Sequence, residues 1–273
     1  MSTKPQKARI TLVGCGKMGG ALLRGWVDSH MIESAIVIDP HQASDLFSDN
    51  KAIEFLNTPP KSYDKGSDLL IIAVKPQILH ESGKEIAKTL PISVPILSIA
   101  AGQNLTSLGN IFGSSRPIIR TMPNTPASIG KGMSVCVSNA NTSSAQKQLA
   151  QMLLETSGKV EWIEEESLMD AVTALSGSGP AYVFYLIEML EKSGIELGLP
   201  PEMARILSRQ TVIGSAALAE HDPDIPASVL RENVTSPGGT TEAALRVLMD
   251  GRAQNILTEA LIAAKQRSKD LNS

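Results

Sequence analysis

Hydrophobic residues recur along the first 164 residues in short β-branched runs, and amphipathic segments lie between these runs. The expected strands cover 8–13, 35–39, 68–74, 94–101, 116–122, 132–137 and 159–164. The clearest helical segments between them are 19–30, 77–90 and 142–158. Strands that are apolar almost throughout and alternate with helices are typical of a parallel sheet covered on both faces. We therefore expect residues 1–164 to form an α/β domain with a Rossmann-like parallel sheet.

The pattern changes after about residue 165, where strand-like runs stop and long helical segments follow. The expected helices cover 166–175, 180–199, 200–221, 241–251 and 253–271. Pro180 and Pro200 mark expected helix starts, and Gly194 and Gly251 mark expected ends. The helix after Pro180 is apolar nearly all round, which means burial on most sides. Residues 165–273 are expected to form an all-helical domain that buries part of its surface against a second copy of the chain.

Composition excludes several classes of protein. The 273 residues are 42% hydrophobic and 19% charged, a balance typical of a globular protein with a sizeable core. The net charge of -3 gives nothing that would attract nucleic acid or an anionic membrane surface. The apolar stretch 181–190 is too short to cross a bilayer. Cys15 and Cys136 stand far apart and fit no disulfide framework, which favours a reducing compartment, the cytoplasm.

The first candidate site is the glycine-rich stretch directly after the first expected strand. Gly14, Gly16 and Gly19 fit the dinucleotide fingerprint, in which glycines allow a tight turn and a close approach to a pyrophosphate. Asp39 follows Gly19 by 20 residues, the place for a carboxylate that accepts a hydrogen bond from a ribose hydroxyl. No GK[ST] closes the motif, so a Walker P-loop is excluded. A glycine-rich turn without a ligand is the alternative.

Two further loops follow expected strands, where such a sheet presents its ligand. AVKPQ covers 73–77, and RTMPNTPASIG covers 120–130. Each alone is compatible with an ordinary turn, but together they favour a ligand at this edge. The four histidines are scattered and form no metal pair, so no metal is expected.

The third candidate lies in the helical half, in ENVTSPGGTTEAALRVLMDG at 232–251. Thr240 and Thr241 are placed to cap the helix that follows, with Ser236, Gly238 and Gly239 just before them. Such a polar, amide-rich helix N-terminus suits a carboxylate. An ordinary N-cap explains one threonine but does not explain the whole SPGGTT unit.

Taken together, VGCGKMGGALLRG, AVKPQ, RTMPNTPA, DAVTALSGSGPAYVF and ENVTSPGGTTEAALRVL resemble the pyrroline-5-carboxylate reductase family. The resemblance runs from about residue 9 to about 265, and the last two blocks are specific to that family. It implies a Rossmann domain joined to a helical domain that interlocks with a second subunit, in dimers that often assemble into a ring of five. The implied reaction is the reduction of the cyclic imine 1-pyrroline-5-carboxylate to L-proline by NADPH or NADH, the last step of proline biosynthesis.

The resemblance also implies roles for individual residues. The pyrophosphate is held by Gly14, Cys15, Gly16, Lys17, Met18 and Gly19, with Asn57 near the adenosine end. The nicotinamide half is lined by Ala73, Val74, Lys75, Pro76, Ala100, Ala101 and Gly102, and Asn233 approaches from the helical domain. Glu166 bounds the substrate site. The substrate carboxylate is held by Ser236, Gly238, Gly239, Thr240 and Thr241, with Ser236 and Thr241 as the catalytic candidates and Thr241 nearest the ring nitrogen.

Two other functions compete with this one. A 3-hydroxyacid or 6-phosphogluconate type dehydrogenase needs a catalytic lysine on the helix after the sheet, and residues 170–191 contain none. A dinucleotide-sensing protein without catalysis has no need of SPGGTT as a second anion site. On cofactor choice, the Asp39 carboxylate would repel a 2′-phosphate, whereas His41, Gln42 and Ser44 could bind one. We expect both cofactors to be used, with a modest preference for NADH.

Overall fold

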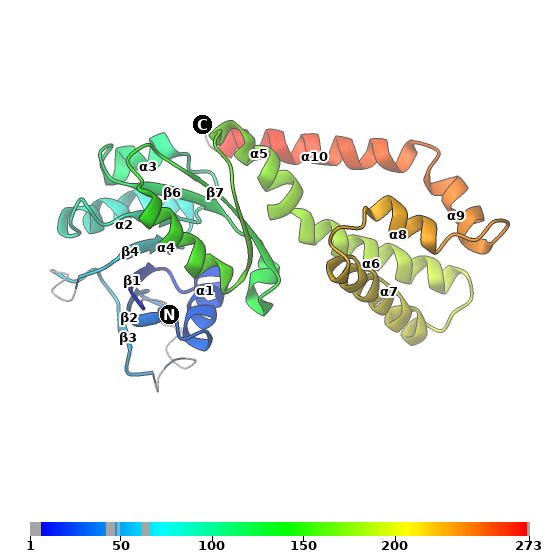
Figure 1. Ribbon diagram of the computed structural model, residues 1–273, viewed down its shortest axis with the longest axis horizontal. Helices are drawn as coiled ribbons and strands as arrows, with labels where there is room; N and C mark the ends of the chain where they lie inside the picture. The colour runs from blue at the N-terminus through cyan, green and yellow to red at the C-terminus, as the bar shows by residue number, and fades with distance from the viewer. Residues whose placement is uncertain (1–6, 42–46, 48–49, 62–65, 272–273) are drawn as a thin grey trace. The chain divides into compact units, whose positions relative to one another are not determined.

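The computed structural model describes residues 7–41, 47, 50–61 and 66–271 (Figure 1). The chain folds into two compact units. The sheet unit contains the described residues up to Gly177 and those from Ala264 onward, and the helical unit is Ser178–Ala263. The expected domain boundary after residue 164 stays a prediction about domain organisation. Along the chain, the first boundary between the two compact units lies between Gly177 and Ser178.

The described part of the sheet unit contains one eight-stranded sheet. Its strands are β1 (Ala8–Val13), β2 (Ile32–Ile38), β3 (Ile53–Leu56), β4 (Leu69–Ile72), β5 (Ile96–Ser98), β6 (Ile118–Met122), β7 (Gly132–Ser138) and β8 (Gly158–Trp162). Their order is β3-β2-β1-β4-β5-β6-β7-β8. Neighbouring strands are parallel except for β6 and β7, so the expectation of a purely parallel sheet is wrong at this pair. Only nine residues, 123–131, join them, fewer than the dozen or more that a parallel crossover needs.

Helices cover both faces of the sheet, as the sequence predicts. One face packs against α1 (Lys17–Asp28) and α4 (Ser144–Glu155), whose Trp26 and Leu153 lie in the same buried cluster. The other face packs against α2 (Pro76–Thr89) and α3 (Leu105–Phe112), and Leu79 and Leu108 lie in that cluster. The sequence analysis did not predict α3 or β3. Both are short, and β3 has only four residues, with Glu54 among them, at the sheet edge.

A series of short helical segments follows the sheet, where one helix over 166–175 was expected. An earlier short segment, η2 (Thr125–Ile129), lies in the link between β6 and β7. After β8 come η3 (Glu166–Leu168), α5 (Met169–Val172) and the π-helical η4 (Thr173–Gly177). The predicted segment is helical, but it changes type along its length. Met169 is buried among Met122, Val135 and Val137 of the sheet unit.

The helices of the last third are α6 (Gly179–Glu196), α7 (Pro201–His221), α8 (Ala227–Asn233), α9 (Thr240–Leu248) and α10 (Arg252–Leu271), whose last turns belong to the sheet unit. Helices α6 and α7 pack together. Pro180 lies in the first turn of α6, as predicted. Gly194 does not end α6, because the turn is made four residues later by Gly198 at φ 93°. No residue of α6 is buried in the single chain.

Candidate active site

The glycine loop after β1 leaves space for a ligand at its centre. Gly14 has φ 90°, and a Cβ added there would lie 2.7 Å from the carbonyl oxygen of Ala73. A Cβ added at Gly16 would meet nothing within 4 Å. Gly16 is also the N-cap of α1, and no side chain caps this helix, so its first N–H groups are available to an anion. The loop therefore fits the pyrophosphate of a dinucleotide.

The structure brings the other predicted cofactor residues of the sheet unit to the same edge. These residues follow the carboxyl ends of adjacent parallel strands: Gly14–Gly19 after β1, Asp39 after β2, Asn57 after β3, Ala73–Pro76 after β4 and Ala100–Gly102 after β5. Ligands of open α/β sheets bind at this edge. Asn233 is the last residue of α8, in the helical unit.

The carboxylate of Asp39 is bonded to the chain itself. Its Oδ2 accepts a hydrogen bond from the Cys15 N–H at 2.6 Å, and its Oδ1 accepts one from the His41 N–H at 2.8 Å. Asp39 thus connects the end of β2 to the glycine loop. Each carboxylate oxygen has a second lone pair, so it can still accept a hydrogen bond from a ribose hydroxyl. The preference for NADH stays a prediction, and Gln42 and Ser44 lie outside the described residues.

Cys15 is buried under the glycine loop. Burial raises the pKa of its thiol to about 11, and the nearby Asp39 carboxylate adds to the rise. The thiol is therefore neutral near pH 7 and is no nucleophile. A cavity of about 470 Å³ touches Cys15, Gly16, Lys17 and Arg24. The two cations on this wall favour a negatively charged ligand nearby.

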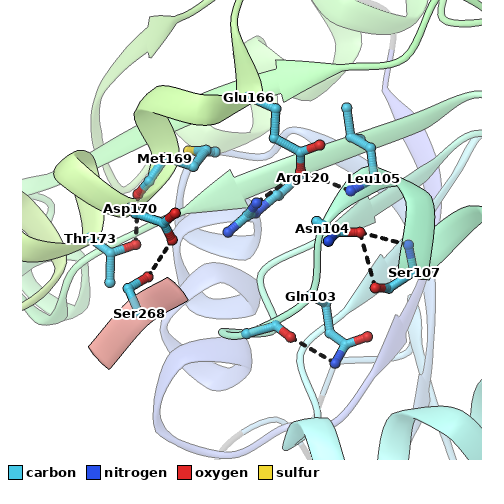
Figure 2. A network of polar contacts seen from close by, with 11 residues as sticks. Gln103, Asn104, Leu105, Ser107, Arg120, Glu166, Met169, Asp170, Thr173 and Ser268 are labelled. Carbon is cyan, nitrogen blue, oxygen red and sulfur yellow. Dashed lines mark hydrogen bonds and ion pairs between the residues drawn. The ribbon is translucent and has the colours of Figure 1, made fainter. Parts of the chain in front are cut away.

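Glu166, which is predicted to lie at the substrate site, already accepts two hydrogen bonds within the chain (Figure 2). Its Oε1 accepts from Arg120 Nη1 at 2.8 Å and from the Leu105 N–H at 2.8 Å. The Arg120 side chain is 5% exposed and that of Glu166 is 27% exposed. The sequence analysis did not single out Arg120, although a cation in the middle of the apolar run 116–122 was a usable signal. Contact between Glu166 and the substrate stays a prediction.

The second candidate site lies in the helical unit, where the chain turns into α9. The Gly239 N–H donates to the Ser236 carbonyl at 3.0 Å, and a Cβ added at Gly238, which has φ 72°, would meet nothing within 4 Å. The N-cap of α9 is Gly239, and no side chain caps the helix. The prediction that Thr240 and Thr241 cap α9 is therefore wrong. The turn at Gly238 lets the helix begin at once, which places both threonines in its first turn.

One donor of this turn is taken by a residue that the sequence analysis missed. Glu242 Oε2 accepts from the Gly238 N–H at 2.5 Å, and its Oε1 accepts from Arg246 Nη2 at 2.8 Å. Arg246 and this N–H hold the pKa of Glu242 below its usual range. An acid in the first turn of a helix was the available signal. The first N–H groups of α9 can receive a substrate carboxylate. The Thr241 hydroxyl has no hydrogen-bond partner among the described residues, so it can donate to another atom of the substrate.

The loop over 120–130 has a clear internal role. Asn124 Nδ2 donates to the Ser176 carbonyl at 3.2 Å, and Asn124 Oδ1 accepts from the Met133 N–H at 2.9 Å. Asn124 therefore joins the end of β6 to β7 and to η4, all within the sheet unit.

The described residues contain neither a membrane-spanning helix nor a metal-binding cluster. No helix in this part of the chain is long and apolar enough to cross a membrane. No group of three or more His, Cys, Asp or Glu side chains in it is arranged to hold a metal ion.

Comparisons with known proteins cover both units. Residues 166–271 match the family model described as pyrroline-5-carboxylate reductase dimerisation, and residues 9–102 match the model described as NADP oxidoreductase, coenzyme F420-dependent. A pyrroline-5-carboxylate reductase of Pseudomonas aeruginosa is 38% identical over 269 residues, which cover 96% of this chain and 96% of the relative.

Two solved structures are similar over the same length. The pyrroline-5-carboxylate reductase of Coxiella burnetii has a TM-score of 0.91 at 31% identity, over 98% of this chain and 100% of that chain. The pyrroline carboxylate reductase of Plasmodium falciparum, solved with NADP bound, has a TM-score of 0.83 at 30% identity, over 99% and 100% of the two chains.

Proposed function

Because the chain belongs to the pyrroline-5-carboxylate reductase family, we propose that it reduces 1-pyrroline-5-carboxylate to L-proline with NADPH or NADH. The observation that carries this proposal is the similarity over nearly the whole chain, which includes both the open glycine loop and the SPGGTT turn. A dinucleotide-binding protein without catalysis would need only the first of these two sites.

The sheet unit is proposed to hold the cofactor. The open space at Gly16 and the uncapped start of α1 fit a pyrophosphate. Ala73–Pro76 and Ala100–Gly102 follow neighbouring strands and form the nicotinamide side. When bound, the reduced nicotinamide supplies a hydride to the C=N carbon of the substrate.

The turn into α9 is proposed to hold the substrate carboxylate. The N–H groups at the start of α9 favour negative charge, and Ser236 adds a hydroxyl donor. The imine nitrogen gains electron density as its carbon is reduced. We assign the Thr241 hydroxyl as the donor that stabilises this nitrogen, with much of the remaining rate coming from the orientation of the two reactants.

The chain is a homo-oligomer of the family's dimerising type, and we propose a dimer through the helical half that assembles further into a ring of five dimers. The exposed apolar side chains of α6, among them Val183, Phe184 and Tyr185, support the dimer contact. We propose the cytoplasm as its compartment, because Cys15 and Cys136 are both free thiols.

The direct test mixes the purified chain with 1-pyrroline-5-carboxylate and NADPH or NADH and follows the loss of reduced nicotinamide, with proline identified as product. We expect turnover with both cofactors. Oxidation of 3-hydroxyacids with NADP+ or NAD+, in place of reduction of the imine, would indicate the rival dehydrogenase. Cofactor binding without turnover of any of these substrates would indicate a sensor.

A further inference from the structure

Arg120 and Glu166 form a largely buried ion pair that no step of the proposed reaction uses. Arg120 lies on β6, and its Nη1 is 2.8 Å from Glu166 Oε1. Arg120 Nη2 is buried and has no hydrogen-bond partner among the described residues. A buried guanidinium N–H without an acceptor is costly, and apolar side chains often replace a buried ion pair without loss of stability. Stability alone is therefore a weak explanation for the presence of the Arg120–Glu166 ion pair.

Glu166 also binds the start of α3 (Figure 2). The same Oε1 accepts from the N–H of Leu105, the first residue of α3, at 2.8 Å. The free N–H groups and partial positive charge of a helix N-terminus favour a carboxylate. One oxygen of Glu166 thus connects β6 with the beginning of α3. Asn104 caps the same helix, since its Oδ1 accepts from the Ser107 N–H at 2.7 Å.

The segment directly before this helix start is the predicted nicotinamide loop, Ala100–Gly102. Its near end is held by the sheet, because the Ile99 N–H donates to the Ile72 carbonyl at 2.9 Å and the Ala100 N–H donates to Ser98 Oγ at 3.3 Å. Ser98 in turn lies opposite Arg120 in the β5–β6 pairing. The far end of the loop continues through Gln103 and Asn104 into α3, so a displacement of the helix start would displace the loop.

We propose that Glu166 and Arg120 are positioning residues for the cofactor, which fix the start of α3 and through it the loop Ala100–Gly102. The inference rests on the proposed function, because the contact between this loop and the nicotinamide is part of that function. It differs from the role that family resemblance implies for Glu166. The carboxylate acts through the loop, so cofactor binding responds to its removal and substrate affinity does not.

The test compares Glu166→Gln with Glu165→Gln. The glutamine at 166 keeps the size of the side chain and one acceptor oxygen but removes the charge that faces Arg120. Glu165 is the adjacent, exposed acid, so the same chemical change there is the matched control. NADPH binding is titrated by the fluorescence of the reduced nicotinamide without substrate, and KM for 1-pyrroline-5-carboxylate is measured at saturating NADPH.

We expect Glu166→Gln to weaken NADPH binding by about tenfold, because the hydrogen bonds from Arg120 and Leu105 lose the negative charge of their acceptor. KM for the imine should stay within about twofold of wild type, a change too small to represent a lost hydrogen bond. Glu165→Gln should change neither value. Arg120→Met should match Glu166→Gln, and the double variant should be no weaker than either single variant, because both remove the same pair. Arg120→Lys, which keeps a charged donor, should restore part of the affinity.

Unchanged NADPH binding in Glu166→Gln would overturn the proposal, and a raised KM for the imine alone would return Glu166 to the substrate site. Thermal melts establish that each variant is folded at the titration temperature. If Glu166→Gln is not folded, Glu166→Asp is titrated in its place and judged by the same two values. The NADPH titration needs no turnover, so a wild-type chain that binds NADPH without reducing the imine would contradict the proposed function alone.

Discussion

Single residues near both candidate anion sites show the same arrangement, a carboxylate bonded to a backbone N–H of the loop itself. Asp39 accepts from Cys15 in the glycine loop, and Glu242 accepts from Gly238 in the turn before α9. Each acid thereby restrains the loop that supplies this N–H. In the proposed function these loops bind anions, and a carboxylate that holds such a loop affects binding without touching the ligand.

Thr241→Ala tests the proposed hydroxyl donor. The change removes one hydrogen bond that strengthens as the imine nitrogen gains electron density, so kcat should fall roughly tenfold to a thousandfold. Cofactor affinity should stay close to wild type, because Thr241 is assigned to the substrate side alone. Steady-state kinetics and an NADPH titration check both values. Near-normal kcat would remove Thr241 from the mechanism.

A pair of substitutions separates two roles of Asp39. Asp39→Asn keeps an oxygen that can accept from the Cys15 N–H but removes the charge, so kcat/KM should shift towards NADPH through lower repulsion of its 2′-phosphate. Asp39→Ala also removes the acceptors for the Cys15 and His41 N–H groups, so both cofactors should bind more weakly, by roughly fivefold to twentyfold for the lost hydrogen bond to the glycine loop. If the ratio of kcat/KM for NADPH to kcat/KM for NADH is the same in wild type and Asp39→Asn, the carboxylate faces away from the ribose.

At the scale of elements, short segments decide where the site residues stand. Helix α3 is only eight residues long, yet its first N–H donates a hydrogen bond to Glu166, and the loop before it is the predicted nicotinamide loop. The last residues of α10 belong to the same sheet unit, where Ser268 Oγ donates to Asp170 at 2.7 Å (Figure 2). Hydrophobic periodicity is weak over such short segments, so position depends on specific polar contacts.

Gly102→Ala tests how closely this loop is packed. Gly102 has φ 69°, and an added Cβ would lie 2.8 Å from the carbonyl oxygen of Leu271, so the substitution should cost about 1–2 kcal/mol or more in stability and weaken cofactor binding. Gly109→Ala in α3 is the control. Its Cβ would meet only Ser114 at 3.8 Å, so it should be neutral or stabilise by about 0.5–1 kcal/mol. Equal melting temperatures and equal NADPH affinities for the two variants would contradict this account.

At the scale of the whole molecule, the helical half is incomplete as a single chain. Phe184 is 59% exposed and Tyr185 is 57% exposed on α6, although an apolar helix of this kind is stable only when most of its circumference is covered. The family match over 166–271 names dimerisation, and we propose that a second copy of the chain covers this helix.

Phe184→Asp should therefore weaken the assembly. A charge at a buried contact loses about 1.5–3 kcal/mol of apolar burial and adds the cost of desolvating a carboxylate. Sedimentation velocity at micromolar concentration should show a dimer or larger for wild type and a smaller species for the variant. Lys84→Asp, on exposed α2 surface of the sheet unit, should sediment as wild type. A wild-type chain that sediments as a stable monomer would refute the dimer.

The sequence by itself determined the elements whose signal is local. The strand–glycine–helix order, the alternation over 1–164 and the long helices after Pro180 follow from side-chain periodicity and backbone freedom, which neighbouring residues set. The positions of Gly14–Gly19 and of Ala73–Pro76 at the same sheet edge follow from parallel strand order, and the structure confirms them.

Only the tertiary structure decided the features that depend on residues far apart in the chain. Three features join segments whose relative register no local pattern encodes. They are the antiparallel pairing of β7 with β6, the hydrogen bond from the Cys15 N–H to Asp39, and the hydrogen bonds from Arg120 and Leu105 to Glu166. Hydrogen bonds of this kind require donor and acceptor within about 3 Å, a distance that packing of the whole core sets. Local sequence therefore predicts which loops carry the site, and the packed core determines which atoms in those loops remain free for a ligand.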